Sequence, residues 1–271
     1  MSRYCYKSSL TSFLSADKDE WISSMKAGFA QNSSLPLGQS QISAWKDCFG
    51  VLKRELVELA EEYQGFDIIF EYILPYESGR RPDVILISKE QVIILEFKMK
   101  NVVFAADMDQ CIAYARDIRE YHFESRDKEV VGILVLTKTK DVLYLDNDSD
   151  TYVCSGDKLG EFLRDEVVEA STACDSDKWV DSAYEPLPTI VSAAKMFMNN
   201  TPLPNIKRVN STGIPKAIDC LSEIAEDAKK NSKHVIAFVT GVPGAGKTFL
   251  GLKYVYDINH LHRLFYLWHA Y

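Results

Sequence analysis

Apolar residues recur at intervals of three and four positions between residues 42 and 63. This stripe consists of Ile42, Trp45, Phe49, Leu52, Leu56 and Leu59. The spacing places all of them on one face of an α-helix, which a protein buries against its core. We therefore expect an amphipathic helix that ends before Gly65, with a short helix or two in the more polar residues 1–40.

Runs rich in β-branched residues follow this helix. They cover residues 66–73, 83–88 (DVILIS), 91–99 (QVIILEFKM) and 130–137 (VVGILVLT). Only Lys89 and Glu90 separate the second run from the third, and a link this short predicts a β-hairpin. Helical patterns cover residues 107–120 and 158–168. The order of these elements predicts an α/β domain whose mixed sheet is covered by helices on both faces.

The chain changes character after this domain. Residues 169–188 are polar and acidic and contain two prolines, which predicts a linker. It would join a domain over residues 1–168 to a segment over residues 189–271. The elements expected in that segment are helices over 189–199 and 215–230 and a strand over 234–240 (HVIAFVT).

Composition narrows the class of protein. Hydrophobic residues make up 46% of the chain and charged residues 26%, which is the balance of a folded globular protein. The formal net charge of −8 argues against a protein that coats nucleic acid without specificity. It leaves room for an acidic metal site beside a local basic cluster. One such cluster consists of Arg80, Arg81, Lys98 and Lys100.

Six cysteines are scattered along the chain with neither a CxxC pair nor zinc-ligand spacing, which favours reduced thiols. The N-terminal residues MSRYCYKSSL lack the basic region and apolar run of a signal peptide. The longest apolar runs are of strand length, well short of the roughly 20 residues that a membrane helix needs. We therefore expect a cytoplasmic protein without a membrane partner, and the oligomeric state stays open.

Candidate chemistry begins with Pro82-Asp83 and with Glu96-Phe97-Lys98, which lie in the two runs of the expected hairpin. Side chains alternate between the faces of a strand, so we expect Glu96 and Lys98 on one face and Phe97 on the other. Asp83 opens the neighbouring strand and can converge with Glu96 beside Lys98. Charged residues are rarely buried in an apolar strand without a partner or a metal ion.

This arrangement suits the hydrolysis of phosphodiesters. The expected ligands of Mg²⁺ or Mn²⁺ are the carboxylates of Asp83 and Glu96 and the backbone carbonyl of Phe97, because these ions prefer hard oxygen donors. Such a metal lowers the pKa of a bound water and polarises the phosphate. The ammonium group of Lys98 would orient that water and offset negative charge in the transition state.

The segments GRRPDVILIS and QVIILEFKMK resemble the core motifs of the PD-(D/E)XK superfamily, the restriction-endonuclease-like nucleases, over roughly residues 42–140. The resemblance implies catalytic roles for Asp83, Glu96 and Lys98. It also implies that Gln110 on the following helix faces the active site, with Tyr114 one turn further along the same face. Members of the superfamily often use one more acid from the first helix or first strand. The candidates here are Glu55, Glu58, Glu62 and Glu71.

A second motif lies towards the end of the chain. Residues 241–248 (GVPGAGKT) fit the pattern G-x-x-x-x-G-K-[ST] between an expected strand and a helical pattern, which indicates a phosphate-binding loop. Backbone N–H groups of such a loop bind the phosphates of ATP. Lys247 would reach the β- and γ-phosphates, and the Thr248 hydroxyl would ligate Mg²⁺. The residues expected to contact the nucleotide are Gly241, Gly244, Ala245, Gly246, Lys247 and Thr248.

The segment VTGVPGAGKTFLGL resembles the start of a Schlafen-group, superfamily 1-like helicase domain, over roughly residues 189–256. Domains of that type occur behind PD-(D/E)XK modules. Only 23 residues follow Thr248, and they contain no Walker B acid, sensor residue or arginine finger. We therefore expect an incomplete P-loop NTPase unit that alone neither hydrolyses ATP efficiently nor unwinds DNA. Its end would mark a truncated gene, a frameshifted gene or the real end of a shortened protein.

Three functions stay open at this point. The first is a metal-dependent nuclease coupled to an ATP-binding helicase-like domain, acting on DNA in preference to RNA; a role in repair or in defence against foreign DNA is implied by the resemblance alone. The second is a catalytically inactive nuclease-like domain that binds nucleic acid. The third is a nucleotide-binding fragment whose first half serves as an interaction domain.

Overall fold

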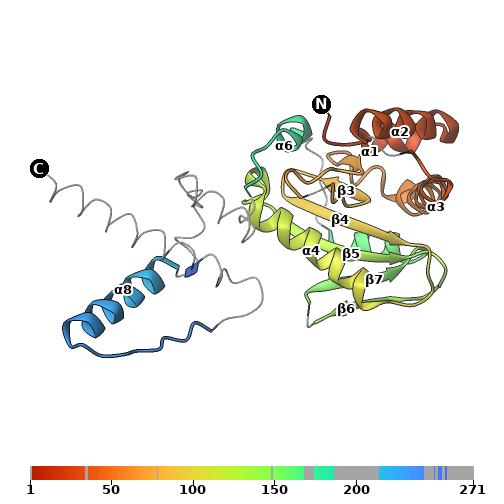
Figure 1. Ribbon diagram of the computed structural model, residues 1–271. Coiled ribbons are helices and arrows are strands. Elements are labelled where there is room, and N and C mark those ends of the chain that lie inside the picture. The colour runs from red at the N-terminus through yellow and green to blue at the C-terminus, as the bar shows by residue number, and fades with distance from the viewer. Residues whose placement is uncertain are drawn as a thin grey trace, which may run out of the picture. The chain divides into compact units, whose positions relative to one another are not determined.

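The computed structural model describes residues 2–33, 36–77, 79–147, 149–167, 174–185 and 214–240, together with Lys247, Leu250, Gly251 and Tyr254. The chain divides into two compact units, Met1–Pro186 and Leu187–Tyr271. Figure 1 shows both units, with the described residues drawn as a coloured ribbon. The helix expected over residues 189–199 lies outside the described residues.

The first unit is built on one mixed sheet of seven strands in the order β1-β2-β3-β4-β5-β7-β6. The strands are β1 (Tyr6–Ser9), β2 (Asp67–Phe70), β3 (Val84–Ile87), β4 (Gln91–Lys98), β5 (Glu129–Leu136), β6 (Leu143–Asp146) and β7 (Thr151–Ser155). Strands β4, β5 and β7 are parallel, and the remaining pairs are antiparallel. The α/β class with a mixed sheet, expected from the order of elements, is therefore confirmed.

The central strands form as their composition predicts. Strands β3 and β4 make the expected antiparallel hairpin, with Val84 opposite Leu95 and Ile87 opposite Val92. All four residues of β3 and the first six of β4 are buried, because helices cover both faces of the sheet. The crossover from β4 to the parallel strand β5 passes through a helix, as parallel strands require.

The helices of the first unit are α1 (Leu10–Ser15), α2 (Lys18–Asn32), α3 (Gln39–Leu56), α4 (Ala105–Tyr121), α5 (Leu159–Glu166) and α6 (Ser176–Val180), with 3₁₀ turns η1 (Val57–Leu59) and η2 (Phe123–Ser125). Helices α1, α2, α3 and α5 contribute to one hydrophobic core. Helices α4 and α6 contribute to a second core on the other face of the sheet. Figure 1 shows α4 running along the strands on that face.

The larger core is centred on aromatic side chains from four elements. The rings of Phe13, Trp21, Phe49 and Phe70 lie within 4.8–6.2 Å of one another in edge-on and tilted pairs. Such pairs add roughly 0.5–1.5 kcal/mol each beyond the burial of their area. Helix α2 also packs closely against Cys5, the residue before β1. A Cβ at Gly28 would collide with the backbone carbonyl of Cys5.

The helical patterns in the first unit are confirmed as α3, α4 and α5, with ends shifted by a few residues. Three strands have no counterpart among the sequence expectations, namely β1, β6 and β7. They are four or five residues long, and their sequences YKSS, LYLD and TYVCS carry polar residues. Strands β1 and β6 are the edges of the sheet and β7 lies next to one of them. Short strands there are specified by the neighbours with which they pair, which a local pattern does not reveal.

Part of the expected linker is folded. Residues 174–185 belong to the first unit and contain helix α6, in which Trp179 is 1% exposed. Trp179, Val180 and Tyr184 pack into the core between α4 and the sheet. The polar and acidic composition of this segment gave no sign that these three side chains are buried in the core. The first unit therefore extends to residue 186, beyond the end expected at residue 168.

In the second unit, helix α8 (Ile214–Lys230) confirms the helix expected over residues 215–230. The strand expected over residues 234–240 is not formed, since these residues belong to neither helix nor strand. The apolar side chains of Val235, Ile236, Phe238 and Val239 are 45–86% exposed. A strand is stabilised by its neighbours in a sheet, and within the described ranges no strand pairs with this segment.

None of the helices in the described part of the chain combines the length and the apolar character needed to cross a lipid bilayer.

Candidate functional site

The candidate site lies at the end of the sheet where β3 begins and β4 ends. Asp83 directly precedes β3, while Glu96 and Lys98 are among the last three residues of β4. The Phe97 backbone N–H donates to Asp83 Oδ2 at 2.8 Å, which fixes the Asp83 carboxylate against β4. Lys98 Nζ lies 2.8 Å from Glu96 Oε1, as expected for residues two positions apart on one face.

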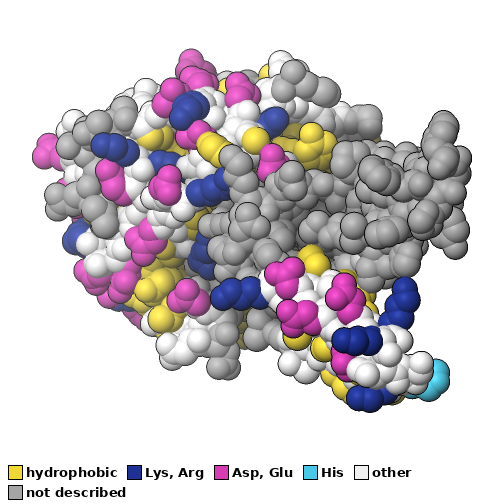
Figure 2. Space-filling view, turned by 90° about the vertical axis from the view of Figure 1, so that its left-hand side faces the viewer, with side chains coloured by type: hydrophobic (Ala, Val, Ile, Leu, Met, Phe, Trp, Pro, Cys, Tyr) yellow, Lys and Arg dark blue, Asp and Glu magenta, His cyan; other side chains and the backbone are white. Residues whose placement is uncertain are grey.

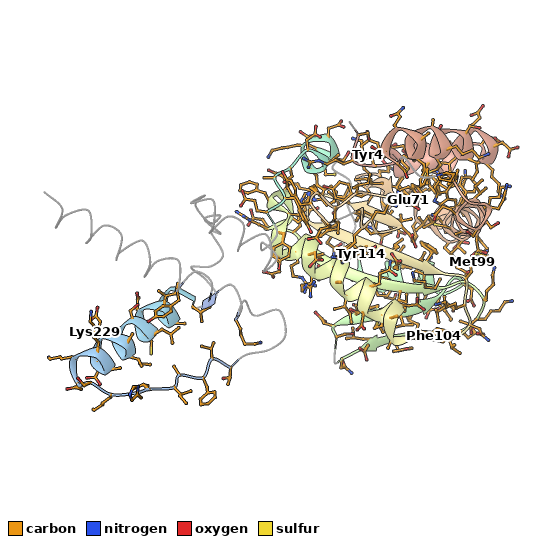
Figure 3. The ribbon with its side chains drawn as sticks, in the orientation of Figure 1. Tyr4, Glu71, Met99, Phe104, Tyr114 and Lys229 are labelled. Carbon is orange, nitrogen blue, oxygen red and sulfur yellow. The ribbon has the colours of Figure 1, made fainter. Side chains whose placement is uncertain are left out.

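Helix α4 completes this cluster from above the sheet. Lys98 Nζ donates to Gln110 Oε1 at 2.9 Å, and Gln110 Nε2 donates to the Tyr114 hydroxyl at 3.1 Å. Gln110 and Tyr114 are one helical turn apart, so both face the strand, as the sequence predicts. The predicted site residues Asp83, Glu96, Lys98 and Gln110 are thus brought together. Figure 3 shows Tyr114 on α4 next to the sheet.

The Glu96 carboxylate is buried and only half satisfied. Its side chain is 1% exposed, and Oε2 has no hydrogen-bond partner among the described residues. Burial and then repulsion from Asp83 raise the pKa of Glu96 to about 8, against the opposing effect of Lys98. Burial also raises the pKa of Asp83, against the Phe97 N–H and the charges of Lys98 and Arg81. The two carboxyls therefore compete for the anionic state.

A third carboxyl, that of the buried Glu71, follows β2, and the Glu71 backbone N–H donates to the backbone carbonyl of Asp83 at 3.0 Å. Its backbone has a φ of 53°, a left-handed conformation that is uncommon outside glycine. Gln41 and Trp45 of α3 donate to its Oε1 at 2.7 Å each, and Arg81 lies 2.8 Å from its Oε2. Burial and then the charge of Asp83 raise the pKa of Glu71 to about 7.

Of the four upstream acids that the sequence left open, the structure therefore brings Glu71 to the site. Glu55 pairs with its neighbour Arg54, and Glu58 lies 3.7 Å from Arg164. Glu62 is exposed. Sequence reasoning could not make this choice, because the partners that hold Glu71 lie 26 and 30 residues away on another element.

The basic cluster expected around the site is neutralised by acids. Arg80 lies 2.7 Å from Asp117, Arg81 pairs with Glu71, Lys98 pairs with Glu96, and Lys100 lies 2.6 Å from Asp107. Sequence reasoning missed Asp107 and Asp117 of α4, although both are buried, and buried acids generally have a cationic partner. Figure 2 shows acidic and basic side chains interspersed on the face in view, rather than one basic surface.

The residues present can be tested against the proposed metal. No three or more His, Cys, Asp or Glu side chains within the described ranges are arranged to hold a metal ion. The expected ligands include only two carboxylates, those of Asp83 and Glu96. The third expected ligand is the backbone carbonyl of Phe97. The unpaired Glu96 Oε2 and the raised pKa of both carboxyls fit a hard divalent cation, since a positive charge there would relieve their repulsion.

Most residues of the expected phosphate-binding loop lie outside the residues that the structure describes. Gly241, Gly244, Ala245, Gly246 and Thr248 lie outside the described residues, and Lys247 occupies a helical position. The expected contacts of this loop with ATP and Mg²⁺ therefore stay predictions.

Comparisons with protein-family models, with curated proteins and with solved structures found no match to this chain.

Proposed function

We propose that the first unit is a metal-dependent nuclease, which hydrolyses phosphodiesters in nucleic acid with Mg²⁺ or Mn²⁺. The observation that carries the proposal is the cluster of Asp83, Glu96 and Lys98. The buried Glu96 and the half-buried Asp83 have carboxyls of raised pKa, Glu96 Oε2 has no hydrogen-bond partner among the described residues, and an ammonium group is held beside them. A fold tolerates such repulsion at a cost in stability, which favours a functional reason for keeping it.

Each residue has a defined part in this chemistry. Asp83 and Glu96, with the Phe97 carbonyl, would hold the cation. When bound, the cation supplies an activated water and a positive charge at the phosphate. Lys98 is kept in place by Glu96 and by Gln110, at 2.8 and 2.9 Å, so its ammonium group can orient a nucleophile and offset charge without moving. Gln110 is a positioning residue, because it acts through Lys98.

The loop that follows β4 supports a nucleic-acid substrate. Met99, Val102 and Phe104 are 45–53% exposed, directly after Lys98 in the chain. Figure 3 shows Met99 and Phe104 at the end of the sheet where β4 leads into α4. We propose that the exposed ring of Phe104 stacks against a base, as aromatic side chains do in proteins that bind single strands. We propose DNA rather than RNA as the main substrate, as the resemblance to restriction-like nucleases implies.

We propose that the second unit binds ATP through residues 241–248, with Lys247 and Thr248 at the phosphates and Mg²⁺, and that it forms part of a helicase-like module coupled to the nuclease. The support for this part is the motif itself and its fit to the sequence pattern.

One observation favours a second candidate function, a catalytically inactive nuclease-like domain. The cations Arg80, Arg81 and Lys100 are all engaged by carboxylates, and Lys98 is bonded to Glu96. Such pairing is also typical of ion pairs whose role is to stabilise the fold.

Cleavage assays separate the two candidates. The full chain would be incubated with single- and double-stranded DNA and RNA, with Mg²⁺ or Mn²⁺ or with EDTA. The variants are Asp83→Asn, Glu96→Gln and Lys98→Met, each similar in size to the parent residue. Lys178→Met, at a 65% exposed lysine on α6, is the control. We expect metal-dependent cleavage by the parent and the control alone. Binding without cleavage by all proteins would support the second candidate, and equal cleavage by all would rule out this site.

A further inference from the structure

A polar cavity lies at the same end of the sheet as the candidate functional site, on the α3 side. Its volume is about 540 Å³, within the usual range for a small-molecule site. Helix α3 forms one wall, and the segments that follow β5 and β7 form the other. The carboxyl ends of parallel strands are where open α/β sheets commonly bind ligands. None of the residues assigned to the hydrolytic site lines this cavity.

The cavity is only one strand away from that site. Thr137 lines it, and the Thr137 backbone N–H donates to the backbone carbonyl of Lys98 at 2.9 Å. The two places are therefore joined through the main chain of β4 and β5, but they use different side chains.

Three cations line this cavity. Lys46 and Arg54 come from α3, and Lys140 comes from the segment after β5. Lys46 and Lys140 are exposed. The Arg54 side chain is 59% exposed although its Nε lies 2.7 Å from Glu55 Oε1, so its remaining guanidinium N–H groups and both ammonium groups can reach a ligand. Ammonium and guanidinium groups converging from opposite walls bind a phosphate group through charge-assisted hydrogen bonds.

Two carboxylates in the same cavity have an unused acceptor. Asp47 Oδ1 accepts from Lys138 Nζ at 2.7 Å, while Asp47 Oδ2 is buried without a hydrogen-bond partner within the described part of the chain. Asp157 Oδ2 accepts from the Asp141 N–H at 3.3 Å, while its Oδ1 is likewise buried and unpaired there. A buried acceptor left unpaired costs about 1–3 kcal/mol, which a ligand with N–H donors would recover.

A glycine in α3 faces this space. Gly50 lies mid-helix, where glycine costs about 1 kcal/mol relative to alanine. A Cβ at Gly50 would meet no atom within 4 Å, so packing among the described residues does not require glycine. Its absence of a side chain leaves the α3 wall of the cavity open.

We propose that this cavity binds a nucleotide whose base carries an exocyclic amino group, either as a free nucleotide or as one residue of a nucleic-acid strand. The phosphate would pair with Lys46, Arg54 and Lys140. The amino group would donate to the carboxylate of Asp47 or Asp157, both of which line the cavity. The assignment goes beyond the proposed hydrolysis, because it requires binding alone and would hold in a chain that cleaves nothing.

The test is equilibrium binding to the full chain by calorimetry. The probes are AMP, UMP and ribose 5-phosphate, and short oligo(dA) and oligo(dT) strands stand for the strand-bound source. Each probe is also measured on Lys247→Ala, which separates binding at the phosphate loop, and on Glu96→Gln, which separates the hydrolytic site. Gly50→Leu fills the cavity without removing a charge, while Gly50→Ala is the matched control that keeps most of the space.

We expect AMP or oligo(dA) to bind at least about tenfold more tightly than UMP or oligo(dT), since a missing amino group leaves the buried acceptors unpaired. Gly50→Leu should weaken that binding at least about tenfold, and Gly50→Ala should not. Lys247→Ala and Glu96→Gln should leave it intact. Binding by AMP alone would identify the free nucleotide as ligand, and binding by oligo(dA) alone a strand. Equal binding of ribose 5-phosphate, indifference to Gly50→Leu, or no binding by any probe would overturn the proposal.

Discussion

Two buried polar clusters lie on the α4 side of the same sheet, and burial acts on them in opposite ways. In the cluster of Asp83, Glu96 and Lys98, burial raises the pKa of both carboxyls. In the cluster of His122, Ser125 and Trp179, burial lowers the pKa of His122 to about 3. Loss of solvent disfavours the charged form in both cases, so burial favours the protonated form of the acids and the neutral form of the histidine.

The second cluster has the character of a structural joint. The His122 and Trp179 rings stack at a centroid distance of 4.1 Å. Trp179 Nε1 donates to Ser125 Oγ at 2.8 Å, and Ser125 Oγ lies 3.0 Å from His122 Nδ1. All members can be neutral, so their contacts stabilise α6 against the domain without electrostatic repulsion.

The carboxyl cluster contains like charges that the described protein groups only partly compensate. Their repulsion lowers the stability of the fold, and a proton or a cation would relieve it. This difference separates a site from a joint, although both are buried, polar and hydrogen-bonded. Four measurements test this distinction.

The largest effect is expected at the joint. Trp179→Ala should lower the free energy of unfolding by about 3–5 kcal/mol, because it removes a fully buried aromatic ring and leaves a cavity. Urea unfolding followed by circular dichroism measures this. Trp179→Phe keeps most of the packing and loses the bond to Ser125, so its loss should be smaller, about 1–3 kcal/mol. A Trp179→Ala protein as stable as the parent would show that α6 is not anchored here.

The next effect is expected at the carboxyls, and on activity rather than on stability. Glu96→Gln should lower metal-dependent cleavage by about a hundredfold or more, equivalent to about 2.7 kcal/mol of barrier. Its free energy of unfolding at pH 8 should equal or exceed that of the parent, because repulsion with Asp83 is removed. Parallel cleavage and urea-unfolding assays test this. A large loss of stability in Glu96→Gln would make the cluster a structural joint as well.

The pH dependence of stability should have opposite slopes at the two clusters. The pKa of Glu96 is raised from 4.5 to about 8, so between these values the folded chain keeps a proton that the unfolded chain has lost. The free energy of unfolding therefore falls as pH rises through this window, by up to about 1.4 kcal/mol per pH unit for one proton. The pKa of His122 is lowered from 6.5 to about 3, so this group contributes stability that is lost as pH falls through that window.

Unfolding measured from pH 3 to pH 9 on single variants resolves the two slopes. Glu96→Gln should flatten the decline above pH 4.5, and His122→Gln should flatten the rise below pH 6.5. If each variant leaves the profile of the parent unchanged, the difference between the clusters is not electrostatic.

The smallest effect is expected from metal binding without substrate. Mg²⁺ at about ten times its dissociation constant should raise the free energy of unfolding by about 1.4 kcal/mol. The gain should be larger at pH 8 than at pH 6, because the carboxyls must lose their protons to bind the cation. Thermal unfolding with and without Mg²⁺ measures it. Trp179→Phe should retain the gain and Glu96→Gln should lose it, and an equal gain in both would place the cation elsewhere.

Much of the framework followed from local pattern. The hairpin of β3 and β4 and the helices α3, α4, α5 and α8 form where the spacing of apolar residues predicts them. The period of two along β4 also put Glu96 beside Lys98, and the helical period put Gln110 beside Tyr114. The failures lie where a neighbour decides the outcome. Residues 234–240 have the composition of a strand but no partner in the described sheet, and Trp179 anchors a segment that resembles a linker.

By itself, then, the sequence determined the central hairpin, the helices α3, α4, α5 and α8, and the faces of β4 and α4 that carry the candidate chemistry, because period and composition are local properties. Only the tertiary structure decided that Glu71 rather than Glu55, Glu58 or Glu62 joins the site. It also decided that the surrounding cations are engaged by acids, and that a second polar cavity opens beside α3. Those outcomes depend on contacts between residues far apart in the chain, and on desolvation, which no local pattern encodes.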